Sequence, residues 1–274
     1  MSGQEELKPY VIGLDLGGTN SVFGIVDTNS DPKNIDYIIP ANDDAKDSVE
    51  TILAACCDAI VEDYVKASLD ALHVIIEQVG GIQTIKAMGI GAPNGNYYKG
   101  TIEFAPNLAW GRNGVVPLAD MFSKGLGGIP VALTNDANAA AIGEMIYGVA
   151  RGMKNFIVIT LGTGVGSGIV INGQVVYGSD GFAGELGHVI AQREGGRSCG
   201  CGRFGCLETY CSATGVARSA REFLEKTTTP SVLRDLKPEE ITSLDVSLAA
   251  AQSDKLAVDV YEFTGKMLGE ACAD

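Results

Sequence analysis

One histidine and three cysteines in the middle of the chain have the spacing of a metal site. His188 is followed after ten residues by Cys199, and Cys201 and Cys206 complete a C-x-C-x4-C pattern. One imidazole and three thiolates form a closed tetrahedral ligand set for structural zinc. The alternative is a group of buried free cysteines beside an unrelated histidine. Because the odd total of seven cysteines does not suit a disulfide framework, we predict that these four residues bind zinc.

A carboxylate directly follows a predicted strand over 131–134. Asp136 stands in the sequence Thr-Asn-Asp-Ala-Asn, where the strand ends and a helix is predicted to begin. Ligands of α/β proteins bind at the carboxyl ends of strands, and a carboxylate there can accept the proton of an attacking hydroxyl group. The same position also suits a helix N-cap. From position alone, both interpretations stay open.

Two glycine-rich turns have the composition of anion-binding loops. Backbone N–H groups in such turns can approach a phosphate closely, because glycine has no Cβ, and threonine adds a hydroxyl donor. A carboxylate at the start of the first turn is able to hold Mg²⁺, directly or through water. Either turn alone is compatible with an ordinary hairpin, whereas two turns of the same plan favour phosphate binding; no Walker P-loop sequence is present. The first turn contains Asp15, Gly17, Gly18, Thr19 and Asn20, and the second contains Gly162, Thr163 and Gly164.

Two glutamates flank the predicted metal loop. Glu185 precedes His188 by three residues, and Glu208 follows Cys206 by two. Beside a fixed metal loop, the two carboxylates suggest a scaffold for a polar ligand. Each of them alone is compatible with a solvated surface position.

The elements that position these residues alternate between strand and helix. Apolar runs on both sides of each glycine turn predict two hairpins, over 10–26 and 156–171. Their similar plan indicates a weak internal duplication. Alternation of this kind predicts an α/β fold. Further strands are predicted over 86–91 and 131–134, and helices over 48–78, 137–147, 213–225, 243–251 and 255–271.

Length and charge limit the classes of function. The 274 residues suit two modest domains, which we place at 1–135, a smaller N-terminal α/β domain, and 136–274, a larger α/β domain with the zinc loop. The net charge of −14 repels phosphate backbones, so we expect no nucleic-acid partner. The polar N-terminus lacks the features of a signal peptide. Glycines interrupt the uncharged stretch 155–179, which argues against a membrane-spanning helix there. We therefore expect a cytoplasmic protein without a membrane partner.

Four segments of the chain combine into one pattern. They are 15–19 (DLGGT), 135–138 (NDAN), 185–188 (ELGH) and 199–208 (CGCGRFGCLE). Together they resemble the ROK family of sugar kinases and sugar-responsive repressors, and 105–108 (APNL) is also similar to a family segment. The C-x-C-G-x-x-G-C-x-E pattern after E-x-G-H is highly specific, and the resemblance covers residues 10–210 well.

The resemblance implies an actin/hexokinase-like (ribonuclease H-like) fold of two α/β domains around a central cleft. It implies an ATP-dependent sugar kinase, with Asp136 as the general base and with glucose, converted to glucose 6-phosphate, favoured by the family's distribution. His188 would also ligate the structural zinc, which then orients the sugar pocket. Both glycine turns would face ATP phosphates, with Mg²⁺ near Asp15, and a homodimer or homotetramer would be common. The sugar contacts would be Asn107, Asn135, Asp136, Glu185, His188 and Glu208.

Three features depart from the family pattern. Asn20 stands where lysine is common, and Asn94 is an extra residue within the usual G-x-P-G segment. The chain ends at Asp274 within a predicted helix, before a further strand and a glycine-rich turn near the adenosine that family members typically have. We therefore expect the sequence to be a fragment.

Alternative functions within the same family stay open. One is a non-catalytic, zinc-stabilised sugar-binding protein, and another is a kinase for fructose, mannose or an N-acetylhexosamine. A sugar-sensing regulator would need an N-terminal helix-turn-helix segment. Against it, the first strand is predicted near residue 10 and the chain is strongly acidic.

Overall fold

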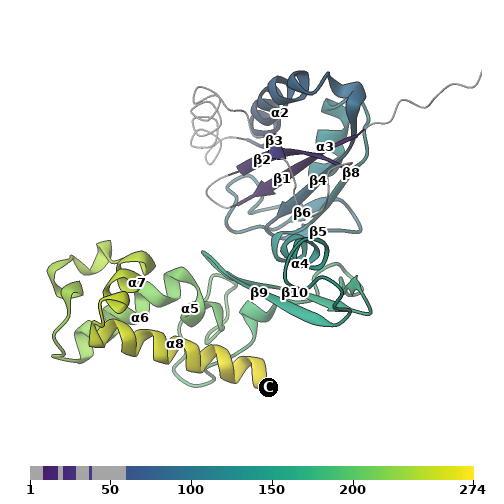
Figure 1. The fold of residues 1–274 in the computed structure, drawn as a ribbon. Coiled ribbons are helices and arrows are strands. Elements are labelled where there is room, and N and C mark those ends of the chain that lie inside the picture. The colour runs from purple at the N-terminus through teal and green to yellow at the C-terminus, as the bar shows by residue number, and fades with distance from the viewer. Residues whose placement is uncertain (1–8, 18–20, 29–36, 39–59) are drawn as a thin grey trace, which may run out of the picture. The chain divides into compact units, whose positions relative to one another are not determined.

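The computed structural model describes residues 9–17, 21–28, 37–38 and 60–274, which group into two compact units. The first unit runs to Val158 and includes Gly168–Ala183; the second comprises Ile159–Ser167 and Gly184–Asp274. Strands and helices alternate along the chain, which confirms the predicted α/β class (Figure 1). The division predicted at 135/136 differs, because residues 136–158 group with the first unit. As a domain boundary, 135/136 stays a prediction.

A five-stranded sheet forms the centre of the first unit. Strands β1, β4 and β8 are parallel, whereas β2 and β3 run antiparallel to their neighbours. The carboxyl ends of the three parallel strands therefore meet at one edge, where Gly91 is in register with both Asp15 and Thr134. In the order β3-β2-β1-β4-β8, the strands are Tyr37–Ile38, Ser21–Asp27, Tyr10–Leu16, Ile85–Ala92 and Val131–Asn135.

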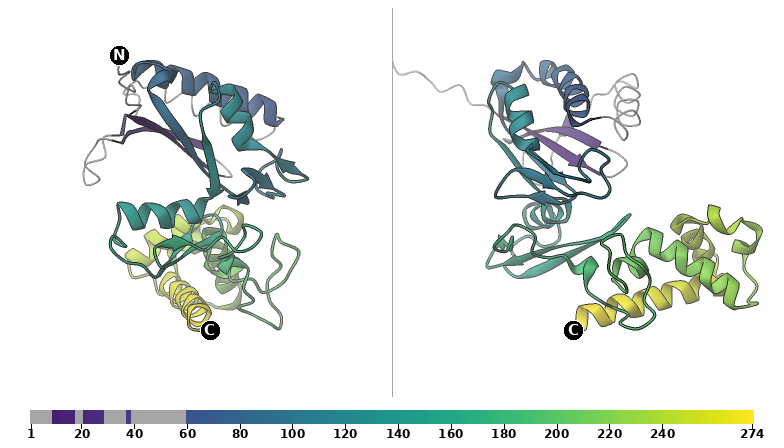
Figure 2. Two further views of the ribbon diagram at one scale, coloured as in Figure 1. Left: turned by 90° about the vertical axis from the view of Figure 1, so that its right-hand side faces the viewer. Right: turned by 180° about the vertical axis from the view of Figure 1, so that it is seen from behind.

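Helices cover both faces of this sheet (Figures 1 and 2). The two helices α2 (Val61–Gln78) and α3 (Leu118–Gly125) lie on one face, and α4 (Asp136–Ile146) lies on the other. The alternation of strand side chains explains the layering, since Ile12, Leu14 and Leu16 of β1 are buried in the core whereas Gly13 and Asp15 are exposed.

Within the described residues, two smaller sheets have three strands each. The second of them, in the order β11-β10-β9, repeats the order β3-β2-β1 of the large sheet. This similarity agrees with the internal duplication expected from the two glycine turns. The strands are β5 (Gly95–Asn96), β6 (Thr101–Glu103), β7 (Val115–Val116), β9 (Phe156–Leu161), β10 (Val165–Ile171) and β11 (Gln174–Val175).

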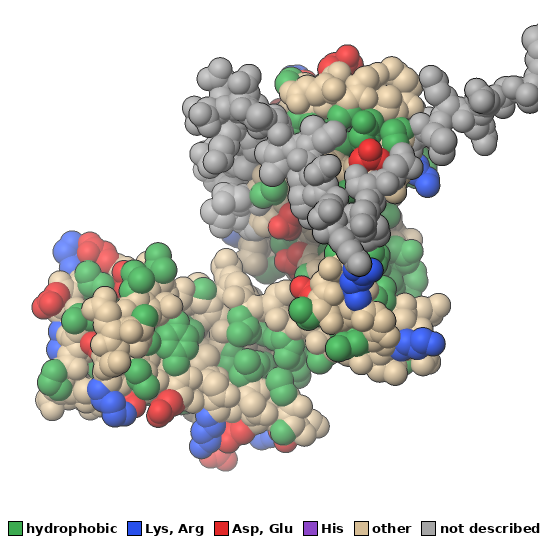
Figure 3. Space-filling model, in the orientation of Figure 1, with side chains coloured by type: hydrophobic (Ala, Val, Ile, Leu, Met, Phe, Trp, Pro, Cys, Tyr) green, Lys and Arg blue, Asp and Glu red, His purple; other side chains and the backbone are tan. Residues whose placement is uncertain are grey.

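The second unit is built mainly from helices. Three of them share an apolar core that contains Val216, Val246 and Val260. Figure 3 shows Lys and Arg side chains interspersed with Asp and Glu side chains over these helices. The ion pairs there are mostly exposed and therefore contribute little to stability. The helices are α5 (Glu208–Cys211), α6 (Ala213–Lys226), α7 (Ser243–Ala251) and α8 (Lys255–Ala273). Short 3-10 turns of this unit are η2 (Leu186–His188), η3 (Val232–Asp235) and η4 (Pro238–Glu240), whereas η1 (Ile82–Thr84) lies in the first unit.

Most predicted elements are confirmed. The strands predicted over 86–91 and 131–134 and the helices predicted over 137–147, 213–225, 243–251 and 255–271 all occur, with ends shifted by two residues at most. Of the helix predicted over 48–78, the part from 48 to 59 lies outside the described residues, and α2 begins at Val61. Among the helices that the structure describes, none has both the length and the apolar character needed to cross a bilayer.

Candidate functional site

Asp136 is the first residue of α4 and directly follows β8. The N-cap of α4 is Asn135, whose side-chain oxygen accepts a hydrogen bond from the Ala137 N–H at 2.9 Å. Oδ1 of Asp136 accepts from the same N–H at 2.8 Å. The capping position considered for Asp136 is therefore occupied by Asn135, and the Asp136 carboxylate begins the first helical turn.

Asp136 and Asp15 lie together at the carboxyl edge of the parallel strands, because β4 brings the ends of β1 and β8 into register. The protein around Asp136 displaces water, although part of the side chain reaches solvent, and this burial raises the pKa of its carboxyl group. The hydrogen bond from Ala137 opposes the shift, and the negative charge of Asp15 adds to it. A carboxyl group with a raised pKa beside a second carboxylate has the properties of a general base next to a cation site.

Asn107 lies exposed on the loop between β6 and β7. Backbone hydrogen bonds close this loop: the Ala105 N–H donates to the Gly111 carbonyl at 3.0 Å, and the Leu108 N–H donates to the Ala105 carbonyl at 3.2 Å. Ala105 and Leu108 are buried, so the loop is anchored on both sides of the asparagine. Of the first glycine turn, Gly17 is described, whereas Gly18, Thr19 and Asn20 lie outside the described residues.

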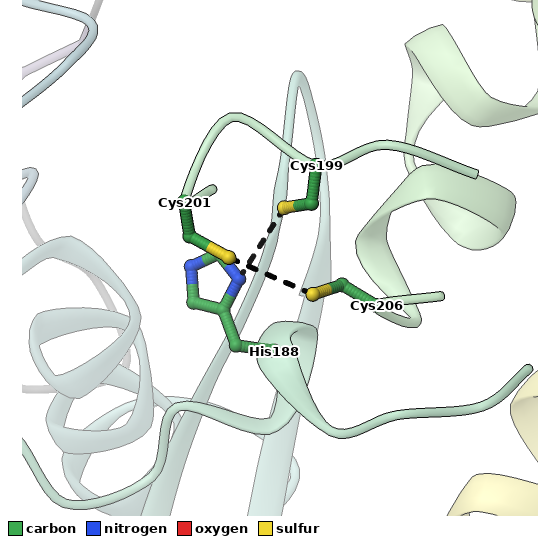
Figure 4. Close-up of side chains that lie close together, drawn as sticks. All are labelled: His188, Cys199, Cys201 and Cys206. Atoms are coloured by element: carbon green, nitrogen blue, oxygen red, sulfur yellow. Dashed lines mark hydrogen bonds between the residues drawn. The ribbon is translucent and has the colours of Figure 1, made fainter. Parts of the chain in front are cut away.

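The four predicted metal ligands converge in the second unit. The ligand atoms of His188, Cys199, Cys201 and Cys206 all lie within 4.8 Å of one another. The Cys199 Sγ lies 3.7 Å from the His188 Nδ1, and the Cys201 Sγ lies 3.6 Å from the Cys206 Sγ (Figure 4). Thiolates on a tetrahedral zinc with Zn–S bonds of about 2.3 Å lie roughly 3.8 Å apart. Both the donor set and its spacing therefore fit zinc.

The fold of the loop explains this convergence. Isolated bridges pair Ile190 with Cys206 and Ser198 with Phe204, which brings the histidine segment against the cysteine segment. Gly205 has a φ of 79°, and a Cβ there would collide with the Gln192 carbonyl. Glycine is therefore required for the loop to close.

The thiols of the cluster differ in acidity. Burial opposes ionisation of Cys201, but hydrogen bonds from Arg203 and from the neighbouring thiols lower its pKa to about 6. Burial raises the pKa of Cys199 to about 12. Cys211 lies outside the cluster, is buried and donates to the Thr264 carbonyl at 3.5 Å.

The second glycine turn is tied to the start of α6. Within the turn, the Gly162 N–H donates to the Gly164 carbonyl at 3.0 Å. The Ala213 N–H donates to the Gly162 carbonyl at 2.8 Å, and the Thr214 hydroxyl donates to the Thr163 carbonyl at 3.4 Å. These bonds hold the turn in one shape.

Glu208 connects that turn to the metal loop. Its Oε2 accepts a hydrogen bond from the Val165 N–H at 3.1 Å, and the Cys199 thiol donates to its Oε1 at 3.8 Å. Glu208 is half-buried, whereas Glu185 is exposed at the start of the η2 turn that contains His188. The second unit thus brings together the glycine turn, Glu208 and the metal ligands, and the first unit brings together Asp15, Asn135 and Asp136.

Arg197 is a buried residue that the sequence did not indicate. Its guanidinium donates to the Thr209 carbonyl at 2.7 Å and to the Glu222 carboxylate at 3.0 Å, and it lies 4.5 Å from the ring centre of Tyr210. Burial raises the pKa of Glu222, but Arg197 and other cations lower it by more. Arg197 thus fastens the segment before Cys199 to α5 and α6. A single arginine between glycine and serine carries no sequence signal of such burial.

The family model of the ROK family matches residues 11–274. The chain belongs to the ROK family. Glucokinases from Halalkalibacterium halodurans and Streptomyces coelicolor are 36% and 35% identical to it over 268 residues, which cover 97% and 96% of this chain and 76% of each relative. A crystal structure of a ROK family glucokinase from Streptomyces griseus with glucose and AMPPNP superposes with a TM-score of 0.73 at 32% identity, covering 97% of this chain and 78% of that chain.

These comparisons confirm the family recognised from the four sequence segments. They also confirm the fold class, since the structures with which the chain superposes include a ROK glucokinase and a ROK hexokinase from Thermus thermophilus. The predicted enzyme class, an ATP-dependent sugar kinase, is confirmed as well.

Proposed function

We propose that this chain transfers the γ-phosphoryl group of ATP to a hydroxyl group of a hexose, with glucose, converted to glucose 6-phosphate, as the first candidate. The observation that carries the proposal is the pair Asp15 and Asp136 at the carboxyl edge of the parallel strands, with the pKa of Asp136 raised by burial. The similarity to proteins named glucokinase supports glucose as the sugar.

In this proposal Asp136 accepts the proton of the sugar hydroxyl as its oxygen attacks the γ-phosphorus and the bond to ADP breaks. A raised pKa makes the carboxylate a better proton acceptor at neutral pH. Phosphoryl transfer otherwise depends on positioning and charge neutralisation. The sugar is held by hydrogen bonds with Asn107, Asn135, Glu185, His188 and Glu208, in which the two glutamates accept from sugar hydroxyl groups.

The phosphates of ATP are held by backbone N–H groups of the two glycine turns, including Gly17, Thr163 and Gly164. Magnesium, when bound near Asp15, supplies charge neutralisation for these phosphates. The cluster of His188 and three cysteines would hold zinc, which supplies rigidity to the loop. Because His188 is one of the ligands, the loop also sets the direction in which its ring faces the sugar.

ADP release with ATP and Mg²⁺ across a panel of hexoses and N-acetylhexosamines tests the proposal. We expect turnover with glucose at the highest kcat/KM. Asp136→Asn should lower kcat by a factor on the order of 10² to 10⁴, the usual contribution of a general base. The matched control is Asp70→Asn, which removes an exposed carboxylate of α2 that pairs only with Lys66 in the described part of the chain.

The outcomes separate the alternatives. An unchanged kcat in Asp136→Asn would disprove the assignment of Asp136 as the general base. Turnover with another hexose instead of glucose would identify that hexose as the substrate. Glucose binding without any ADP release would point to the non-catalytic sugar-binding protein.

A further inference from the structure

We propose that Asn96, Tyr98 and Tyr177 form a clasp that positions segment 178–183 and thereby sets the affinity of the enzyme for its sugar. The inference rests on the proposed function, because segment 178–183 leads directly into Glu185 and His188. All residues of the clasp belong to the first unit. Asn96 lies in β5, Tyr98 in the turn that follows it, and Tyr177 directly before the segment.

Asn96 is the centre of the clasp and is completely buried. Its Nδ2 donates to the Asp180 carbonyl at 2.9 Å and to the Glu103 carboxylate at 3.2 Å. Its Oδ1 accepts from the N–H groups of Tyr98 at 3.1 Å and Lys99 at 3.3 Å. The buried amide therefore uses both its donor and its acceptor side, and its loss would leave several polar groups without partners.

Aromatic rings close the clasp at the surface. Tyr97 and Tyr177 stack with ring centres 4.3 Å apart and planes 5° from parallel, and the Tyr98 ring meets Tyr177 edge to face at 6.0 Å. The Tyr98 hydroxyl donates to the Gly178 carbonyl at 2.9 Å. These contacts hold the start of the segment, while Asn96 holds its middle.

The backbone of the segment is shaped to accept this arrangement. Gly181 is buried with a φ of 95°, and a Cβ at this position would lie 2.8 Å from the Asn96 Oδ1. Only glycine suits both the backbone conformation and the space beside Asn96. The segment is thus built to lie against β5.

Both sides of the clasp adjoin segments with proposed sugar contacts. The turn at Gly95 packs against β8, because a Cβ on Gly95 would collide with the Thr134 carbonyl, and β8 ends at Asn135. On the other side, the chain passes from Ala183 into Gly184 and Glu185. Fixing Asp180 against Asn96 therefore ties the strand that carries Asn135 to the segment that leads to Glu185.

Sugar and ATP kinetics of clasp variants, combined with hydrogen exchange, test the inference. Tyr98→Phe removes only the hydroxyl group and should raise the sugar KM about two- to fivefold. Asn96→Ala should raise it by about tenfold or more, because buried partners lose their hydrogen bonds. In both variants kcat and the ATP KM should stay within about twofold of the parent, and amide exchange over 178–183 should become faster.

The control is Tyr147→Phe, since the exposed Tyr147 of the same unit has a hydroxyl without a hydrogen bond in the described part of the chain. It should change neither the sugar KM nor the exchange. If Asn96→Ala does not fold, Tyr98→Phe still decides the question.

Two results would overturn the inference. The first is faster exchange over 178–183 with an unchanged sugar KM, which would mean that the clasp is only structural. The second is an equal loss in sugar KM, ATP KM and kcat. The exchange measurement needs no turnover and the proposed base is tested by Asp136→Asn, so failure of the clasp and failure of the proposed function remain distinguishable.

Discussion

The Glu208 carboxylate accepts a hydrogen bond from the Val165 backbone N–H at 3.1 Å, although the two residues are 43 positions apart in the chain. The other carboxylate oxygen faces the Cys199 thiol at 3.8 Å. One side chain thus joins the second glycine turn to the metal loop. The geometry of the second glycine turn and that of the cluster of His188 and three cysteines are therefore linked through Glu208.

Two substitutions of Glu208 should separate the effect of its hydrogen bond to the glycine turn from the effect of its negative charge. Glu208→Ala leaves the N–H of buried Val165 without its acceptor, which costs about 1–3 kcal/mol. If the turn faces ATP, this should raise the ATP KM about tenfold. Glu208→Gln keeps an oxygen acceptor and should leave the ATP KM within about twofold, whereas the sugar KM should rise in both variants. Equal ATP KM values in the alanine variant and the parent would contradict the link.

The raised pKa of Asp136 makes stability depend on pH. Folding disfavours the charged carboxylate, so the cost is absent below the ordinary pKa of 3.8 and appears as pH rises toward the higher folded value. Asp136→Asn removes this cost. We expect a higher melting temperature than the parent at pH 7, with the difference vanishing near pH 3.5. Thermal melts at both pH values check this, and a lower melting temperature for Asp136→Asn at pH 7 would disprove it.

The same pKa shift predicts an acid limb in the rate profile. Only the ionised Asp136 can accept the proton of the sugar hydroxyl. Below its raised pKa, kcat should therefore fall about tenfold for each further pH unit, and the midpoint should lie above the ordinary carboxyl range. Steady-state rates from pH 4 to pH 8 measure the limb. A rate that stays flat down to the ordinary carboxyl pKa would argue against Asp136 as the base.

The metal site predicts about one zinc per chain in the purified protein, measured by elemental analysis. Cys201→Ser should reduce the zinc content, because Cys201 is one of the four converging ligands. Cys272→Ser is the matched control, since Cys272 is exposed and lies outside the cluster. A parent protein that is metal-free and yet fully folded would end this assignment.

We expect the buried Arg197 side chain to contribute to the free energy of unfolding of the second unit. Arg197→Met breaks a buried network of hydrogen bonds and an ion pair with Glu222, and should lower the free energy of unfolding by about 3–5 kcal/mol. Arg218→Met removes a more exposed partner of the same carboxylate and should cost at most about 1 kcal/mol. Denaturant unfolding of both variants compares the two. Equal losses would show that burial of the guanidinium contributes nothing.

The sequence by itself determined the features that depend on short separations. The metal ligands occupy 19 consecutive residues, so their spacing alone indicates a loop around one ion. Asp136 stands at a strand-to-helix boundary that apolar periodicity predicts, and β8 and α4 occur there. Helices α6, α7 and α8 follow from apolar residues at helical spacing, because burying one face requires that period.

The tertiary structure alone decided which distant residues meet. The register of β4 brings Asp15 and Asp136 to the same edge of the sheet, and the Asn96 side chain bonds to Asp180, 84 residues away. It also decided that Asn135, and not Asp136, is the N-cap of α4. Asparagine, tyrosine and arginine are all compatible with an exposed turn, so their residue types alone do not indicate burial. A hydrogen bond between remote segments also leaves no periodic pattern in the sequence. Such contacts exist only when packing brings the segments together and excludes the water that would otherwise satisfy them.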